Sequence, residues 1–163
     1  MTRSLPLLLV LLAVLCLIQV FGLSRLTLFG VSPDIVTTFV AVISVFTGQR
    51  TGMTYGFASG MLTGLLSGNI GVSLLTRIVE GFISGYCHVP EKSHATMTQK
   101  SRMLYLAIVL ASFFGNLVFN LFNDPLGESL AYRIFISGTL TCMMNLLLGI
   151  ALNKLFLRKT LSE

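Results

Sequence analysis

The chain has 163 residues, of which 54% are hydrophobic and only 10% are charged, and its formal net charge is +5 at pH 7. A soluble domain usually carries about a quarter charged residues, so this composition excludes a water-facing surface and predicts a membrane protein. The length allows one compact domain over residues 1–163, with no room for a separate soluble catalytic module. The basic residues lie in short loops and in the C-terminal tail, which argues against binding of nucleic acid.

A long apolar segment, LPLLLVLLAVLCLIQVFGL, follows Arg3 and predicts a transmembrane helix over residues 5–23. A cleaved signal peptide is the alternative. The segment is long for the apolar region of a signal peptide, and no small-x-small cleavage site follows it. Val14 and Leu15, which precede Cys16, also lack the small side chains of a lipoprotein cleavage site. We therefore expect this helix to be retained.

Three shorter helices are predicted between residues 31 and 87. Pro33 and Asp34 are typical of a helix start and open the first of them, over residues 33–47. A polar turn separates it from the second, at residues 52–66, and a Ser-Gly-Asn break precedes the third, at residues 70–87. The first two are too short for a lipid-facing span. Short helices are tolerated at membrane depth when protein covers them, so we expect these in the middle of a bundle.

Two more apolar segments, at residues 102–122 and 131–155, complete an all-α prediction of six transmembrane helices in one compact bundle. Six spans place both termini on one side, together with most of the basic residues: Arg3, Arg50, Lys92, Lys100, Arg102, Lys154, Arg158 and Lys159. The other side holds Arg25 and Arg133, with Asp34, Asp124 and Glu128 beside them. The positive-inside rule then puts both termini in the cytoplasm, whereas a five-span alternative would put the basic C-terminus outside.

Glycine occurs at every fourth position from residue 48 to residue 68. Five of these glycines belong to the helix predicted at residues 52–66 or directly follow it: Gly52, Gly56, Gly60, Gly64 and Gly68. Residues four apart lie on one helix face, which drifts by about 40° per step. In lipid, where helices gain little from hydrophobic association, small residues allow backbones to approach closely. We expect this glycine stripe to pack the helix against neighbours in its own bundle. The alternative is a stripe that faces a separate protein.

Arg77 and Glu80 are charged residues within the predicted helix at residues 70–87, and their spacing of three places them on one face. A charge at bilayer depth is costly and marks an ion pair, a cavity or a transport pathway. Two interpretations remain open at this point. The pair is either a mutual ion pair or part of a substrate site or partner contact.

Polar and small residues form stripes on the last two predicted helices. The first stripe is Ser112, Asn116 and Asn120, and the second is Ser137, Thr141, Asn145, Gly149 and Asn153. The simplest expectation is that the two stripes hydrogen-bond to each other. The alternative is a small-molecule pocket, whose intramembrane polar site would combine Arg77, Glu80, Asn116, Asn120 and Asn145.

No catalytic or metal-binding pattern is recognised. There is no Ser/His/Asp set, H-E-x-x-H motif or P-loop, and acid–base chemistry by Glu80 would need a second positioned group. The cysteines at positions 16, 87 and 142 are far apart and are interpreted as packing thiols. Cys87, His88 and His94 are interpreted as ordinary loop residues in preference to metal ligands. We expect a non-enzymatic protein without a metal or cofactor.

Two stretches resemble the rod shape-determining protein MreD family. Gly30-Val31-Ser32-Pro33-Asp34-Ile35, followed by an apolar helix, resembles the start of that family's second helix. Gly56-Phe57-Ala58-Ser59-Gly60 resembles its Gly-Phe-x-x-Gly stretch, and the length and six-span layout also match. The family-motif residues are therefore Pro33, Asp34, Gly56, Phe57 and Gly60. One departure is Gly64, where the family often has an aspartate.

The resemblance implies a scaffold in the bacterial inner membrane that helps to maintain rod cell shape. Its partners would be membrane lipid and MreC. Through MreC it would associate with MreB and the peptidoglycan synthases of the elongation machinery. The family fold is similar to the substrate-binding subunits of energy-coupling-factor transporters. That similarity supplies a second hypothesis, in which the chain binds a vitamin for such a transporter. A channel would need a continuous polar path and is a third possibility.

Overall fold

The structure is a computed structural model, and it describes residues 5–25, 27, 31–90, 96–123 and 129–154. The regular structure in this part of the chain is helical, as predicted. Its elements are α1 (Leu5–Phe21), the 3-10 turn η2 (Leu23–Arg25), α2 (Ile35–Thr47), α3 (Gln49–Ser67), α4 (Ile70–Gly85), α5 (Met97–Phe122), α6 (Leu130–Tyr132), the π-helix η3 (Arg133–Ser137) and α7 (Gly138–Leu152).

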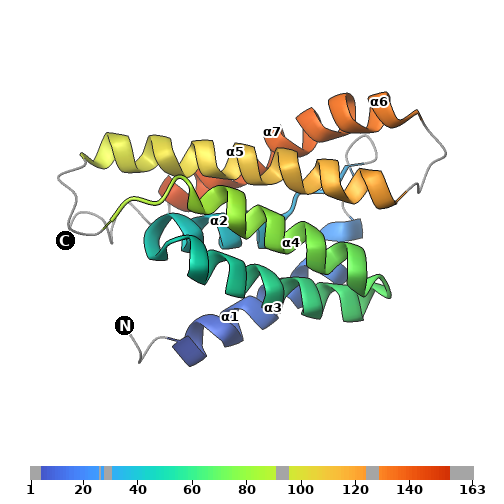
Figure 1. Ribbon diagram of the computed structural model, residues 1–163, viewed down its shortest axis with the longest axis horizontal. Coiled ribbons are helices and arrows are strands. Elements are labelled where there is room, and N and C mark those ends of the chain that lie inside the picture. Colours follow the sequence, from blue (N-terminus) through green and yellow to red (C-terminus); the bar gives the residue numbers. More distant parts are fainter. Residues whose placement is uncertain (1–4, 26, 28–30, 91–95, 124–128, 155–163) are drawn as a thin grey trace.

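The long helices run side by side and alternate in direction, so that α1 begins and α7 ends at the left-hand end of Figure 1. Within the described residues, three segments are long and apolar enough to cross a membrane: Leu7–Arg25, Met97–Phe122 and Arg133–Leu152. These correspond to the three longest predicted spans. A crossing by the other helices stays a prediction, and α2 is a shorter apolar helix.

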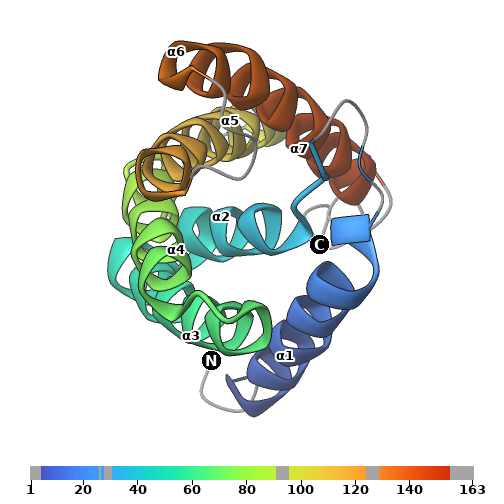
Figure 2. The same ribbon diagram turned by 90° about the vertical axis from the view of Figure 1, so that its right-hand side faces the viewer.

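The short helix α2 is the centre of the molecule, as Figure 2 shows. It contacts α1, α3, α4, α5 and α7. Its side chains Val36 and Val40 are fully buried in a cluster with α1 and α3, whereas Ala41 and Val45 are buried in a second cluster with α5. A helix surrounded on all sides needs apolar and small residues around its whole circumference, which the sequence IVTTFVAVISVFT provides.

Several helix boundaries differ from the predictions. Gly48 makes the turn between α2 and α3 alone, with a φ of 96°, so α3 begins at Gln49 and the predicted four-residue turn does not exist. Conversely, α5 begins five residues before the predicted position 102, because Thr96 and Gln99 form a capping box there. Helix α4 ends at Gly85, two residues early. His94, Asp124 and Glu128 lie outside the described residues, as do Arg3, Lys92, Arg158, Lys159 and Gly30.

The middle of the glycine stripe packs against α4, which is the most extensive helix contact in the described structure. A Cβ atom placed on Gly60 would lie 2.7 Å from the Cα atom of Leu74. One placed on Gly64 would lie 2.6 Å from the Cα atom of Ile70, and one on Gly56 would overlap the carbonyl of Arg77. Real Cβ atoms essentially never come this close to backbone atoms. The two helices therefore touch through their backbones, and only glycine permits that distance.

The contact continues toward α2 through a pair of facing glycines. A Cβ atom on Gly52 would lie 2.9 Å from the carbonyl oxygen of Gly81 and 2.7 Å from the Cβ atom of Ser44. A Cβ atom on Gly81 would in turn overlap the carbonyl of Gly52. The hydroxyl of Ser44 donates to its own helix at Val40, at 2.8 Å. The drift of the stripe around α3 thus lets one end serve α2 as well as α4.

Gly68 is a correction to the predicted packing stripe. It ends α3 in the left-handed conformation with a φ of 78°, and no atom lies within 4 Å of a Cβ placed there. Glycine is needed at this position for its backbone conformation, as at the C-terminal end of many helices. The regular spacing therefore joins two different requirements, because Gly48 and Gly68 form turns whereas the four glycines between them allow close packing.

Replacing Gly56 or Gly60 with leucine should separate α3 from α4 and lower the free energy of unfolding by about 1–3 kcal/mol or more, because the new side chain overlaps backbone atoms. Denaturation in mild detergent, followed by circular dichroism, measures the loss. Gly71→Leu is the matched control, since Gly71 lies on α4 with no atom within 4 Å of its Cβ position. Equal stability of Gly60→Leu and Gly71→Leu would contradict the packing role.

Candidate functional site

Asp34 caps the N-terminus of α2 and attaches that end to another helix. Its Oδ1 atom accepts hydrogen bonds from the backbone N–H groups of Val36, at 3.0 Å, and Thr37, at 3.1 Å. These bonds satisfy donors that have no partner within a helix. The backbone N–H of Asp34 itself donates to Oδ1 of Asn145 on α7, at 2.7 Å. The start of α2 is therefore fixed in position relative to α7.

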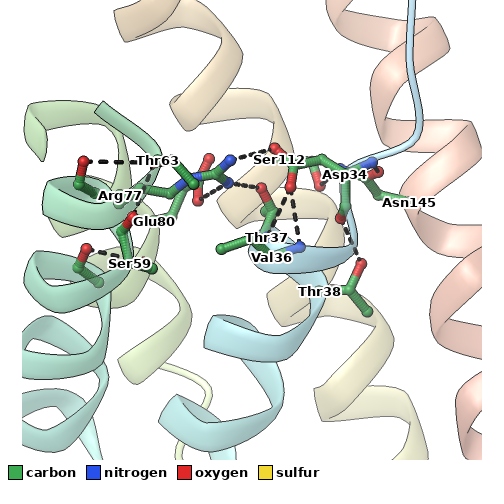
Figure 3. Close-up of polar contacts among 12 residues, drawn as sticks. Asp34, Val36, Thr37, Thr38, Ser59, Thr63, Arg77, Glu80, Ser112 and Asn145 are labelled. Atoms are coloured by element: carbon green, nitrogen blue, oxygen red, sulfur yellow. Dashed lines mark hydrogen bonds and ion pairs between the residues drawn. The ribbon is translucent and has the colours of Figure 1, made fainter. Parts of the chain in front are cut away.

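Arg77 of α4 lies between two carboxylates. Its Nη2 is 2.7 Å from Oδ2 of Asp34, and its Nη1 is 2.9 Å from Oε2 of Glu80. Nη1 also donates to the hydroxyl of Thr37, at 2.5 Å. Figure 3 shows the guanidinium group pointing from α4 toward the start of α2. Arg77 and Glu80 are only 8% and 3% exposed, so these partners replace the water that the charges lose.

The ion pair of Arg77 and Glu80 is one of the two interpretations that the sequence allowed. The structure adds Asp34 as a second acid, which the sequence analysis had placed among the residues of the outer loops. Together, these three charges form a triad that joins α4 to α2, and we call it the Asp34–Arg77–Glu80 triad. The remaining face of Glu80 packs on α5, where a Cβ atom on Gly115 would lie 2.7 Å from Cγ of Glu80.

The polar stripes of α5 and α7 bond to each other, as expected. Nδ2 of Asn116 donates to the hydroxyl of Thr141, and Nδ2 of Asn145 donates to the hydroxyl of Ser112, both at 2.9 Å. Nδ2 of Asn120 donates to the carbonyl of Arg133, at 3.3 Å, and to the side chain of Asn116. These bonds tie α5 to η3 and α7.

Asn153 forms the same kind of bond at the other end of α7, and donates to the hydroxyl of Tyr105 at 2.7 Å. It also reaches the hydroxyl of Ser101, at 3.2 Å. Gly149 lies between Asn145 and Asn153 in this stripe and packs closely against α5, because a Cβ there would overlap Ile108. The second stripe therefore contacts α5 from Thr141 to Asn153.

The triad and several of the amides line one cavity of about 950 Å³. This volume is at the upper end of the range for small-molecule sites. All five residues of the predicted intramembrane polar site line it: Arg77, Glu80, Asn116, Asn120 and Asn145. The cavity also has an apolar part, formed by Val20 of α1 and by α5, η3 and α7, with the side chains Phe119, Phe135, Ile136, Leu140 and Met143.

Sequence reasoning did not find several residues of this site. Gln19 of α1 donates to the carbonyl of Pro33, at 3.1 Å, and accepts from the N–H of Ile35, at 3.0 Å. Thr37 binds Arg77, and Thr76 lines the cavity with a hydroxyl that has no hydrogen-bond partner in the described structure. For Asp34, the sequence indicated a helix start, because this residue follows a proline directly before an apolar segment. No sequence signal indicates that Gln19 and Thr37 face the same cavity.

Other candidate residues lie apart from this cavity. The four packed glycines of α3 are covered by α4 and α2 and do not line it. Cys16, Cys87 and Cys142 are free thiols, each buried in a different part of the bundle. Within the described ranges, no group of three His, Cys, Asp or Glu side chains is placed to hold a metal ion.

Comparisons of the chain with protein-family models, with curated proteins and with solved structures find no match. No comparison therefore supports the resemblance to the MreD family, which has the residues Pro33–Asp34 and Gly56–Gly60 as its basis.

Replacing Arg77 with methionine should lower the free energy of unfolding by about 3–5 kcal/mol, because the buried Glu80 and the half-buried Asp34 lose their counter-charge. The double variant Arg77→Met/Glu80→Gln should lose less than the sum of the two single variants, by about 0.5–3 kcal/mol. Detergent unfolding of all three measures the coupling. Arg50→Met, at an exposed position in the first turn of α3, is the control. Strictly additive losses would show that Arg77 and Glu80 are not coupled.

Substitution of Gly115 by alanine should displace the Glu80 carboxylate and lower stability by about 1–3 kcal/mol, since the added methyl group overlaps Glu80. Gly138→Ala is the matched control, because a Cβ there would be at an ordinary 3.6 Å from Nδ2 of Asn116. The same unfolding assay compares the two variants. A loss in Gly138→Ala as large as that in Gly115→Ala would contradict the proposed fit of Glu80.

Proposed function

We propose that the chain is a multi-pass protein of the bacterial inner membrane with both termini in the cytoplasm. Three long apolar helices support this proposal, together with the alternating directions of the helices in Figure 1. Their outward side chains are apolar: Leu7, Val10 and Leu17 of α1 are each at least 47% exposed, and Leu147 of α7 is 66% exposed. Such surfaces are unfavourable in water and favourable in lipid.

Within that membrane, the function that we propose is a non-enzymatic scaffold of the cell-wall elongation machinery, similar to the MreD family. The observation that carries this proposal is the position of the resemblance residues in the fold. Asp34 begins the central helix and binds α4 and α7, whereas Gly56 and Gly60 join α3 to α4 through their backbones. The stretches that resemble the family are thus among those that hold the helices together.

The partner-facing surface of such a scaffold is not the glycine stripe, whose middle is already covered by α4 and α2. Phe57 is the family-motif residue that remains outside, with 48% of its surface exposed. It lies on α3 with Met61 and Leu65, which follow at intervals of four and are 47% and 57% exposed. Residues at this spacing share one helix face. We assign the contact with an MreC-type single-span partner to this face.

Affinity purification of the tagged chain from its native host in mild detergent, followed by mass spectrometry, tests the scaffold. Recovery of an MreC-type protein and of wall-synthesis proteins is expected. Phe57→Ala should lower that recovery about tenfold at an unchanged membrane level, because aromatic anchors in interfaces commonly contribute more than 1 kcal/mol. Phe114→Ala, on α5 and 38% exposed, is the control. Absence of wall-synthesis proteins from the wild-type sample would contradict the scaffold role.

The cavity is the one observation that favours a second candidate function. A vitamin-binding subunit of an energy-coupling-factor type transporter would need a pocket of this size with convergent polar groups. The same purification separates the two functions, because a transporter subunit would retain a stoichiometric vitamin-like molecule or an ATPase module. A scaffold would retain wall-synthesis proteins instead.

A further inference from the structure

We propose that the cavity binds the uncharged polar head of an amphiphile, a molecule whose head carries hydroxyl or amide groups and whose apolar chain leaves the protein past Phe119, Phe135 and Met143. The ligand class is thus a neutral glycolipid or a similar lipid, held with its head beside the Asp34–Arg77–Glu80 triad. This inference rests on the membrane location proposed above and is independent of the scaffold function.

The charges of the cavity have partners within the protein. Arg77 binds both Asp34 and Glu80, and the second oxygen of Asp34 accepts two backbone hydrogen bonds at the start of α2. Arg133, the other cation in the lining, donates to the carbonyl of Asn123, at 2.5 Å. A phosphate or carboxylate would have to compete with these contacts to bind. The two acids of the lining, Asp34 and Glu80, also balance its two arginines, so the cavity favours a head without a formal charge.

Neutral polar residues are the most numerous among the remaining residues that line the cavity. Thr76 is only 6% exposed, and its hydroxyl oxygen has no hydrogen-bond partner in the described structure. A buried hydroxyl without a partner is costly, so a ligand that supplies one would gain affinity. The hydroxyl groups of Ser73 and Ser137 line the same space. Gln19, Thr63 and Asn116 also line it, with amide and hydroxyl groups that already bond to neighbouring residues. Groups that both donate and accept match the hydroxyl and amide groups of a neutral head.

The apolar part of the lining is also part of the outer surface. Phe135 and Met143 line the cavity and are nevertheless 67% and 59% exposed, and Phe119 is 36% exposed. The cavity therefore continues to the lipid-facing side of the bundle between α5 and the η3–α7 segment. At this point the chain forms the π-helix η3, a rare conformation that occurs frequently at functional sites. An apolar chain leaving by this route would stay in lipid.

The test uses the full chain in nanodiscs of phosphatidylcholine that contain a dodecyl maltoside with a diazirine in its alkyl chain. Illumination and peptide mass spectrometry should place at least tenfold more label on residues 115–122 and 133–145 than on residues 7–17 of α1, which do not line the cavity. Asn116→Leu should lower this labelling at least fivefold. Asn153→Leu is the matched control and should leave it unchanged, because both asparagines bond α5 to α7 but only Asn116 lines the cavity.

A dodecyl phosphate with the same diazirine should label the two segments at least tenfold less. Equal labelling by this anionic probe would overturn the choice of a neutral head, and unchanged labelling of Asn116→Leu would overturn the site. If both asparagine variants lose labelling through unfolding, Met143→Trp tests the site in their place. This change at an exposed position fills only the mouth of the cavity, so it should lower the labelling without unfolding the protein. Unchanged labelling of Met143→Trp then also overturns the site. Retention of a water-soluble metabolite that the maltoside does not displace would overturn it in favour of the transporter function.

Discussion

The ion pair between Arg77 and Asp34 is the interaction on which the rest of the structure depends. A buried guanidinium group is tolerable only when carboxylates replace its water, so Arg77 requires the start of α2 to lie beside α4. Asp34 at the same time caps α2 and binds Asn145 on α7 through its backbone. One residue thereby fixes the end of the central helix relative to two others, and α2 contacts every other long helix.

The length of α2 explains why a cavity exists at this end of the bundle. Thirteen residues of helix span roughly 20 Å, whereas the 26 residues of α5 span roughly 39 Å. The central helix therefore fills only part of the space that its longer neighbours enclose. Residues 31–34 approach α2 without helical structure, and both Val31 and Asp34 line the cavity. Backbone of this kind at membrane depth is acceptable where it is covered by protein or faces a cavity.

Close packing of α3 on α4 has a consequence for both proposed activities. Because Gly56 and Gly60 leave no gap between these helices, the pair forms one rigid wall that carries Arg77 and Glu80 on its inner side. Its outer side carries the exposed Phe57. The proposed scaffold surface and the proposed ligand cavity therefore lie on opposite sides of the same unit. Binding at one does not obstruct the other, so the two proposals are physically compatible.

The sequence by itself determined the helical class, the three long apolar helices and the close-packing glycines, because each depends on local composition or on a spacing that one helix repeats. Pairing between the stripes of α5 and α7 was also predictable, since both stripes follow the helical period. Only the tertiary structure decided that Asp34 meets Arg77, 43 positions away, and that Gly68 makes a turn and takes no part in packing. The cavity also required the tertiary structure. It results from a short helix enclosed by longer ones, and such a difference in length has an effect only after the helices have packed.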